Sequence, residues 1–176
     1  MTQCKQSWRA GRERRLMDAA PARLSRGTAC KGNSVDKHYP VIDTRSIVMR
    51  WGDMDAVGHL NNTYYFRYLE QIRLDWLESL GHGIDPSGCG PVLAGTSCVF
   101  RKEITYPATL DITIELEKLG RSSLKLRHHF YRRDDPGVVY ASGEVTLVWV
   151  DYQAGKSVSI PDDIREAVET AAKSAV

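Results

Sequence analysis

The chain has 176 residues, a length that suits a single domain with a substantial apolar core. Its 24 lysines and arginines nearly balance its 22 aspartates and glutamates, which leaves a formal net charge of +2. Composition therefore gives no reason to expect nucleic acid or an acidic membrane surface as a partner.

The apolar runs and the cysteines indicate where the protein resides. The longest runs, such as Val145 to Val150, are far shorter than the roughly 20 residues of a membrane-spanning helix. The cysteines contain no C-x-x-C pair, and a chain of this length folds without disulfide bonds. We therefore expect a soluble protein with free thiols in the cytoplasm, with no membrane span.

Residues 1–37 differ from the rest of the chain in being rich in arginine. They lack the continuous apolar stretch of a secretory signal. A disordered basic tail, a start codon placed too early, an organelle transit peptide and an arm for nucleic acid all stay open as interpretations. We expect the folded domain to occupy residues 38–176. The arginines of the first segment are Arg9, Arg12, Arg14, Arg15, Arg23 and Arg26.

The first regular elements are a strand, a loop and a long helix. The β-prone residues 47–49 run into a loop rich in glycine and asparagine, residues 52–62. Apolar residues then recur with helical spacing, and Gly81 supplies a stop signal. This pattern predicts one long helix with an apolar face formed by Tyr65, Leu69, Ile72, Trp76 and Leu80.

The second half of the chain is typical of antiparallel strands. Residues 110–117 and 124–131 alternate apolar and polar side chains, and the turn at 120–123 joins them into a hairpin. A second turn at 134–137 leads into residues 138–150, which are apolar on both faces and indicate a central strand. Residues 92–100 add a further strand.

A short closing helix is expected after Pro161, because Asp162 and Asp163 suit its first turn. The order of strand, long helix and meander predicts an α+β fold, in which a sheet of about five strands wraps around one central helix.

Polar residues concentrate in the loop before the long helix. The unpaired amides of the first helical turn, near Asn61 to Tyr64, can hold a carbonyl oxygen as it becomes an oxyanion. The carboxylate of Asp55 can attack the same carbonyl or activate a water molecule. The alternative is structural, because Asp53, Asp55 and the two asparagines also suit turns and helix caps.

The segment G-D-M-D-A-V-G-H-L-N-N-T-Y-Y-F-R-Y-L-E-Q-I-R, residues 52–73, resembles the signature of the hydroxybenzoyl-CoA thioesterase-like family of the hotdog superfamily. Outside it the resemblance is one of layout, over about residues 44–160. It implies a hotdog fold and hydrolysis of acyl-CoA to free acid and CoA. It also implies that Asp55 is the nucleophile or general base and that the backbone N–H of Asn62 polarises the thioester carbonyl. The H-x-N-N form is more similar to the fatty acyl-CoA thioesterases of the family.

Other residues receive weaker assignments. His59 is expected to orient Asp55 or the substrate, although a histidine in a Gly-His turn is as often structural. Asp53 is more consistent with satisfying loop amides. Glu70 is the runner-up for the catalytic carboxylate, because a second hotdog lineage uses a helical one. The alternative for Glu70 is a local ion pair with Arg67 and Arg73.

Substrate contacts are expected from Gly58, Asn61 and Tyr65 in the same segment. Cations and hydroxyls at strand ends and turns are candidates for the phosphates of CoA, above all Arg121 and Ser122. The wider set of such candidates is Arg101, Lys102, Arg121, Ser122, Ser123 and Lys125.

No metal or redox cofactor is expected, because the chain has no clustered His/Cys set and no phosphate loop, and His128 and His129 fall on opposite faces of one strand. The resemblance further implies a homodimer or homotetramer. Two other functions stay open, a thioesterase for acyl groups on a carrier protein and an acyl-CoA-binding protein without turnover.

Overall fold

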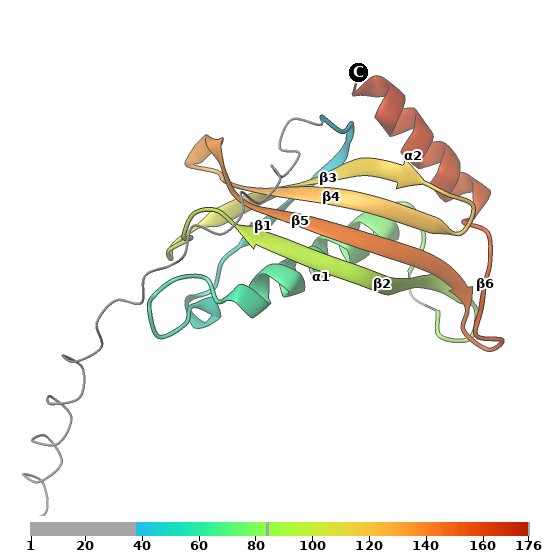
Figure 1. Ribbon diagram of the computed structural model, residues 1–176, viewed down its shortest axis with the longest axis horizontal. Helices are drawn as coiled ribbons and strands as arrows, with labels where there is room; N and C mark the ends of the chain where they lie inside the picture. The colour runs from blue at the N-terminus through green and yellow to red at the C-terminus, as the bar shows by residue number, and fades with distance from the viewer. Residues whose placement is uncertain (1–37, 84, 176) are drawn as a thin grey trace, which may run out of the picture. The chain divides into compact units, whose positions relative to one another are not determined.

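The computed structural model describes residues 38–83 and 85–175 (Figure 1). The predicted basic tail, residues 1–37, lies outside the described residues. The elements are β1 (Val41–Val48), the 3₁₀ turn η1 (Trp51–Asp53), α1 (Asn62–Ser79), β2 (Cys89–Phe100), β3 (Thr109–Leu119), β4 (Ser123–Arg132), β5 (Asp135–Asp151), β6 (Lys156–Ser157) and α2 (Asp162–Ser174).

One antiparallel sheet contains all six strands. Its order is β1-β3-β4-β5-β2, and the two-residue β6 pairs with β5. The expected sheet of about five strands around one long helix is therefore confirmed, and β6 is an addition that the sequence pattern did not predict. β5 lies inside the sheet, as expected of a strand that is apolar on both faces. β1 and β2 are the two edges of this path.

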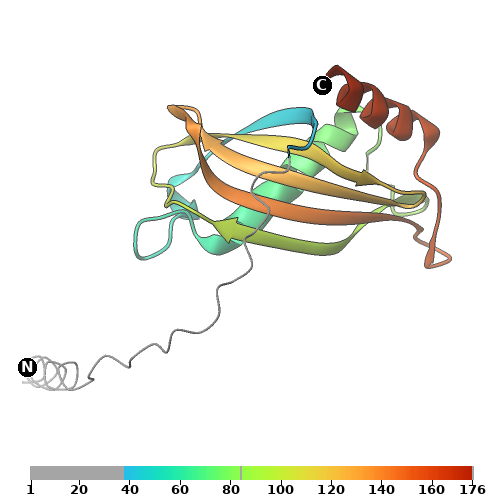
Figure 2. The ribbon, with the colours of Figure 1, turned by 45° about the horizontal axis from the view of Figure 1, so that its top comes forward.

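The long helix α1 crosses one face of the curved sheet (Figures 1 and 2). The predicted apolar face is the one it buries, because Tyr65, Leu69, Ile72 and Trp76 all lie in the core. Gly143 on β5 permits a close approach, since a Cβ atom there would lie only 2.8 Å from Cδ1 of Leu69. The packing against the sheet therefore fixes the distance of α1 from the sheet and its direction across it.

The predicted closing helix is α2. Its buried residues are Ile164 and Val168, and its Arg165 donates a hydrogen bond of 2.8 Å from Nη2 to the carbonyl oxygen of Gly120. This contact places α2 beside the turn between β3 and β4. None of the helices among the described residues combines the length and the apolar character that a bilayer crossing requires.

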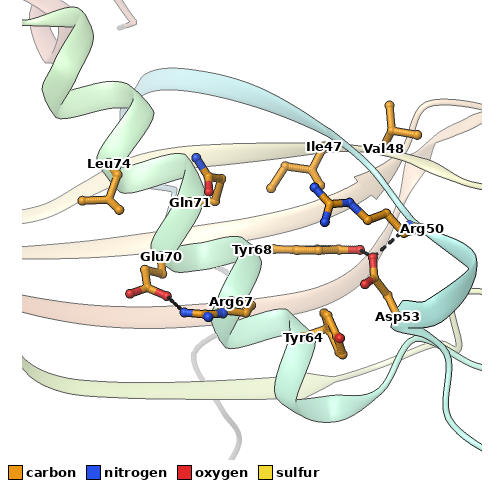
Figure 3. Close-up of a pocket in the computed structure, with 10 residues that line it drawn as sticks. All are labelled: Ile47, Val48, Arg50, Asp53, Tyr64, Arg67, Tyr68, Glu70, Gln71 and Leu74. Carbon is orange, nitrogen blue, oxygen red and sulfur yellow. Dashed lines mark hydrogen bonds and ion pairs between the residues drawn. The ribbon is translucent and has the colours of Figure 1, made fainter.

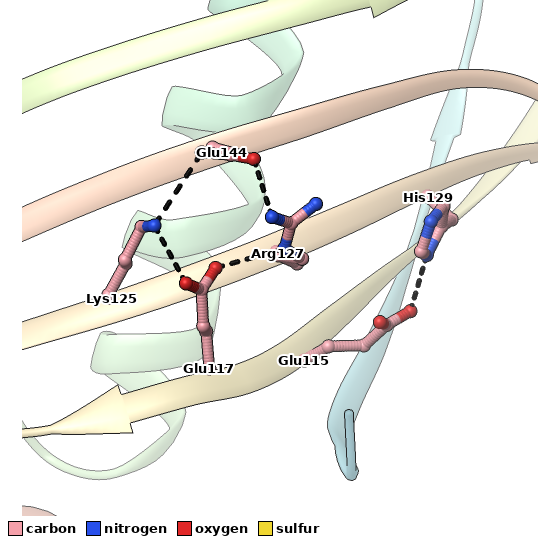
Figure 4. Close-up of polar contacts among 6 residues, drawn as sticks. All are labelled: Glu115, Glu117, Lys125, Arg127, His129 and Glu144. Carbon is pink, nitrogen blue, oxygen red and sulfur yellow. Dashed lines mark hydrogen bonds and ion pairs between the residues drawn. The ribbon is translucent and has the colours of Figure 1, made fainter. Parts of the chain in front are cut away.

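The face of the sheet opposite α1 carries a network of ion pairs (Figure 4). Glu117 accepts from Nζ of Lys125 at 2.7 Å and from Nε of Arg127 at 2.9 Å. Arg127 also pairs with Glu144 at 2.7 Å. These cations are engaged on the sheet, which is the ordinary structural use of charged residues on strands.

His128 is a polar residue within the apolar core. It faces α1, whereas His129 lies on the other face of β4 with Nδ1 2.7 Å from Oε1 of Glu115, so the predicted opposite placement of the two histidines is confirmed. Nδ1 of His128 lies 2.9 Å from the carbonyl oxygen of Thr113, which can only accept, so Nδ1 carries the proton. Nε2 is buried without a partner among the described residues.

Burial makes His128 a source of acid sensitivity. Desolvation of the imidazolium lowers the pKa of His128 to about 4, whereas the ordinary value is 6.5. The unfolded chain therefore binds a proton at this residue below about pH 6.5, while the folded protein does so only near pH 4. The stability that neutral His128 contributes is complete above pH 6.5 and is lost as the pH falls toward 4.

We predict that His128→Gln flattens the dependence of stability on pH. Between pH 7 and pH 5, His128 should cost the wild type about 2 kcal/mol of unfolding free energy, which the variant does not lose. Urea unfolding of both proteins at the two pH values measures the difference. Equal losses in both proteins would contradict the assignment, whatever their absolute stabilities.

Candidate active site

The loop between η1 and α1 is closed on itself by backbone hydrogen bonds. The N–H of Asn61 donates to the carbonyl oxygen of Asp53 at 2.9 Å, and the N–H of Asp55 donates to that of His59, also at 2.9 Å. Gly58 has φ of +88°, a conformation that favours glycine, and its N–H donates to the carbonyl oxygen of Asp55. The loop therefore has a defined shape before any ligand arrives.

The carboxylate of Asp55 is oriented by this loop. Oδ1 accepts a hydrogen bond of 2.8 Å from the N–H of Val57, with the N–H of His59 at 3.5 Å. The side chain is exposed. Within residues 38–83 and 85–175 no hydrogen bond reaches Oδ2, so this oxygen is available to attack a carbon or to accept a proton.

The N-terminus of α1 follows this carboxylate closely in the sequence. Asn61 is the N-cap, and its Oδ1 accepts from the N–H of Thr63 at 3.0 Å. The capping interpretation of Asn61 is thus confirmed. Asn62 is the first residue of the helix, where a backbone N–H has no intrahelical partner. Its N–H is therefore suited to an oxyanion.

These groups line one pocket of about 320 Å³. Four of the predicted site residues, Asp55, His59, Asn62 and Tyr65, come together there, with Arg101 and Lys102 from the wider set of phosphate candidates. The remaining wall comes from the end of β2 and the residues after it. The full lining is Asp55, His59, Leu60, Asn62, Tyr65, Phe100, Arg101, Lys102 and Glu103.

Tyr65 forms an apolar wall of this pocket. Its ring packs edge-on against Phe100, with centroids 4.8 Å apart, and against Phe130 at 5.3 Å. Burial raises the pKa of Tyr65 to about 12, with a smaller contribution from the charge of Cys98. The phenol therefore stays neutral at physiological pH and is suited to packing against an acyl group.

His59 contributes to the loop mainly through its backbone. It forms an isolated β-bridge with Thr105, its carbonyl oxygen accepts from the N–H of Asp55, and its N–H lies 3.5 Å from Oδ1 of Asp55. Its half-buried side chain lines the pocket. A backbone contact therefore supports the prediction that His59 orients Asp55. The role of the imidazole stays a prediction.

Asp53 points away from this pocket into the protein. Oδ2 accepts from the N–H of Arg50 at 2.8 Å and from the hydroxyl of Tyr68 at 2.6 Å (Figure 3). Asp53 therefore has the structural role that was expected of it, although it accepts from a single amide, that of Arg50 just before the loop. The contact with Tyr68 was not predicted, because the spacing of the helix gives no sign that this phenol reaches back to the loop.

Glu70 lies outside the Asp55 pocket. It is exposed on α1 and forms an ion pair of 2.7 Å with Arg67, as the structural alternative predicted (Figure 3). Both residues line a separate hollow of about 520 Å³ between α1 and the end of β1. Within this chain Glu70 and Asp55 therefore do not share one site.

Arg121 and Ser122 are not brought to the Asp55 pocket within one chain. They lie in the turn after β3, whereas the pocket lies at the end where β3 begins, and the 11 residues of that strand span about 34 Å. The cations that line the pocket are Arg101 and Lys102. Arg101 donates to the hydroxyl of Ser142 at 3.2 Å.

Comparisons with known proteins agree with this arrangement. Residues 49–168 match the sequence signature of the thioesterase-like superfamily. A solved structure of a candidate thioesterase from Pseudomonas aeruginosa, the PA2801 protein, is 40% identical with a TM-score of 0.71, and the match covers 73% of this chain and 98% of that one.

Curated relatives include YsmA from Bacillus subtilis, which is 27% identical over 122 residues, or 69% of this chain and 82% of YsmA. The long-chain acyl-CoA thioesterase FadM from Escherichia coli is 25% identical over 129 residues, or 72% of this chain and 97% of FadM. The matched residues 49–168 contain the strands β2 to β6, the long helix and the closed loop with Asp55. The chain thus belongs to the thioesterase-like superfamily, with its hotdog fold, and is a thioester hydrolase.

Proposed function

We propose that the protein hydrolyses acyl-CoA thioesters and that Asp55 is its catalytic carboxylate. The observation that carries this proposal is the meeting of Asp55 and the first-turn amide of Asn62 in one pocket. Acyl transfer needs a base or nucleophile on one side of a carbonyl and donors for its oxygen on the other. This pocket offers both.

The chemistry begins when the thioester carbonyl oxygen accepts a hydrogen bond from the N–H of Asn62. Asp55 then acts in one of two ways. It attacks the carbonyl carbon, which expels the CoA thiolate and leaves an anhydride for water to cleave. Alternatively, it takes a proton from a water molecule that attacks the same carbon. Both routes give the free acid and CoA, and Oδ2 of the exposed Asp55, which accepts no hydrogen bond from the described residues, suits either role.

A fatty acyl group is the substrate class that we favour. Leu60, Tyr65 and Phe100 give the pocket an apolar wall, and the H-x-N-N form of residues 59–62 supports an aliphatic acyl chain. Arg101 and Lys102 supply positive charge for the phosphates of CoA. The reaction would then belong to lipid metabolism in the cytoplasm.

Release of thiol from a panel of acyl-CoAs tests this function. Short, long and aromatic substrates are compared for the wild type, Asp55→Asn and Glu70→Gln. Hydrolysis of long-chain substrates that only the Asp55 change abolishes would support the assignment. Binding of the panel without turnover would instead indicate an acyl-CoA-binding protein or an enzyme for carrier-bound acyl groups.

We predict that Asp55→Asn lowers kcat by at least about 100-fold, because the change removes the nucleophile or base while Asn keeps an oxygen for the loop amides. The melting temperature should not change, since the side chain is exposed. Asp151→Asn is the matched control. Oδ1 of Asp151 likewise accepts from two turn amides, those of Gln153 and Ala154 at 2.9 and 2.8 Å. An equal loss of kcat in both variants would count against Asp55.

We also propose a homodimer formed through β2, with a homotetramer as its possible further assembly. β2 is a 12-residue edge strand, and an unpaired edge of that length is a template for pairing with another chain. Its exposed apolar residues are Val92, Leu93, Val99 and Phe100. Antiparallel pairing of two β2 strands would bring the Arg121 end of one sheet toward the Asp55 pocket of the other chain.

We predict that Leu93→Glu converts the dimer into single chains, because it places a charge in the middle of the pairing strand. Sedimentation velocity measures the mass. Val48→Glu, at an exposed valine on the opposite edge strand β1, is the control and should leave the mass unchanged. A wild type that sediments as one chain would contradict the dimer without affecting the role of Asp55.

A further inference from the structure

The residue two positions before Asp55 is a buried carboxylate. Asp53 is 5% exposed, and Oδ2 accepts from the N–H of Arg50 and the hydroxyl of Tyr68. A carboxylate withdrawn from water is costly unless donors replace its hydration, and charge-assisted hydrogen bonds are the strong ones. This buried contact therefore has a preferred geometry and resists displacement.

One backbone hydrogen bond and the chain itself connect Asp53 to the two members of the proposed catalytic pair, Asn62 and Asp55. The carbonyl oxygen of Asp53 accepts from the N–H of Asn61 and so closes the neck of the loop. Asp55 follows Asp53 by two residues, and Asn62 follows Asn61 directly. Any shift of Asp53 therefore changes the position of the Asp55 carboxylate relative to the amide of Asn62.

Tyr68 ties this neck to the body of the helix. It lies six residues beyond Asn62 and is buried, so it belongs to the part of α1 that the sheet holds. Ends of helices open locally more readily than their packed middles. A bond from the loop to Tyr68 thus fixes the loop to the stable part of α1 as well as to its first turn.

Neither residue lies where it would touch the substrate. Asp53 and Tyr68 line the hollow of about 520 Å³, which shares no lining residue with the pocket that contains Asp55 (Figure 3). Desolvation, followed by the hydrogen bond to Asp53, raises the pKa of Tyr68 above its ordinary value. The phenol therefore keeps its proton and stays a donor throughout the pH range in which an enzyme operates.

We propose that Asp53 and Tyr68 are positioning residues, whose buried hydrogen bond holds the Asp55 loop in register with the N-terminus of α1. The inference rests on the proposed function of Asp55. It predicts that loss of the bond affects turnover more than substrate binding, because small misplacements of catalytic groups are costly in rate.

Tyr68→Phe tests this role, since it removes only the hydroxyl. We expect kcat to fall about 10- to 100-fold while KM changes less than about twofold. Hydrogen exchange of the backbone amides in residues 54–61 should become faster, with exchange in β3 to β5 unchanged. Val168→Ala, a buried change in α2, is the control for a general loss of stability and should alter neither quantity.

Asp53→Asn provides a second variant, which keeps the shape of the side chain but removes its charge, and it should act in the same direction as Tyr68→Phe. The proposal is overturned if kcat of Tyr68→Phe falls no further than that of Val168→Ala, or if exchange in residues 54–61 stays at the wild-type rate. The exchange measurement needs no turnover. An inactive wild type with a loosened loop in Tyr68→Phe would therefore reject the proposed function and keep the positioning role.

Discussion

The packing of α1 against the sheet is the constraint on which the site depends. Leu69 is fully buried opposite Gly143, and a side chain at that glycine would collide with the methyl groups of Leu69. Because the helix cannot slide or lift without opening the core, its first turn has a fixed position. The oxyanion-binding amide that we assign to Asn62 is therefore set by hydrophobic packing several residues away from it.

Polar groups complete what the packing begins. Few polar residues are buried in the core, and three of them form local hydrogen bonds. The Asp53 side chain accepts from Arg50 and Tyr68, Glu115 pairs with His129, and His128 bonds to the backbone of β3. Burial lowers the pKa of Arg73 to about 10, opposed by the nearby charge of Glu70, so its guanidinium stays charged at neutral pH. These buried polar residues thus help to order the structure around α1.

The long helix could be predicted because its apolar face repeats over four turns, and the hairpin of β3 and β4 because alternation and turn residues agree. β1 was harder. Its middle residues, 43–46, are polar, as suits an edge strand, and the pattern gave only residues 47–49 where the strand spans Val41–Val48. β6 could not be predicted, because its two residues are too few to show an alternation of apolar and polar side chains.

The candidate site was predictable only in part. Asp55, His59 and Asn62 are close in sequence, so a motif can reveal them together. Phe100, which was not among the predicted site residues, reaches the pocket through the pairing of β2 with β5, whose register shifts between Leu93 and Gly95. A bulge of that kind leaves no clear trace in composition. Arg121 and Ser122 lie at the other end of the sheet from the Asp55 pocket of the same chain, so a contact of theirs with CoA needs a second chain and stays a prediction.

The closed neck of the loop has a consequence for how such a protein can change over generations. Its shape is set by backbone bonds between Asp53 and Asn61 and between Asp55 and His59, while Ala56 and Val57 stand exposed at its tip. Substitutions at the tip can alter what an incoming molecule meets without disturbing the carboxylate two residues away. Selection can therefore change the surface beside the pocket while the backbone bonds that hold the loop are preserved.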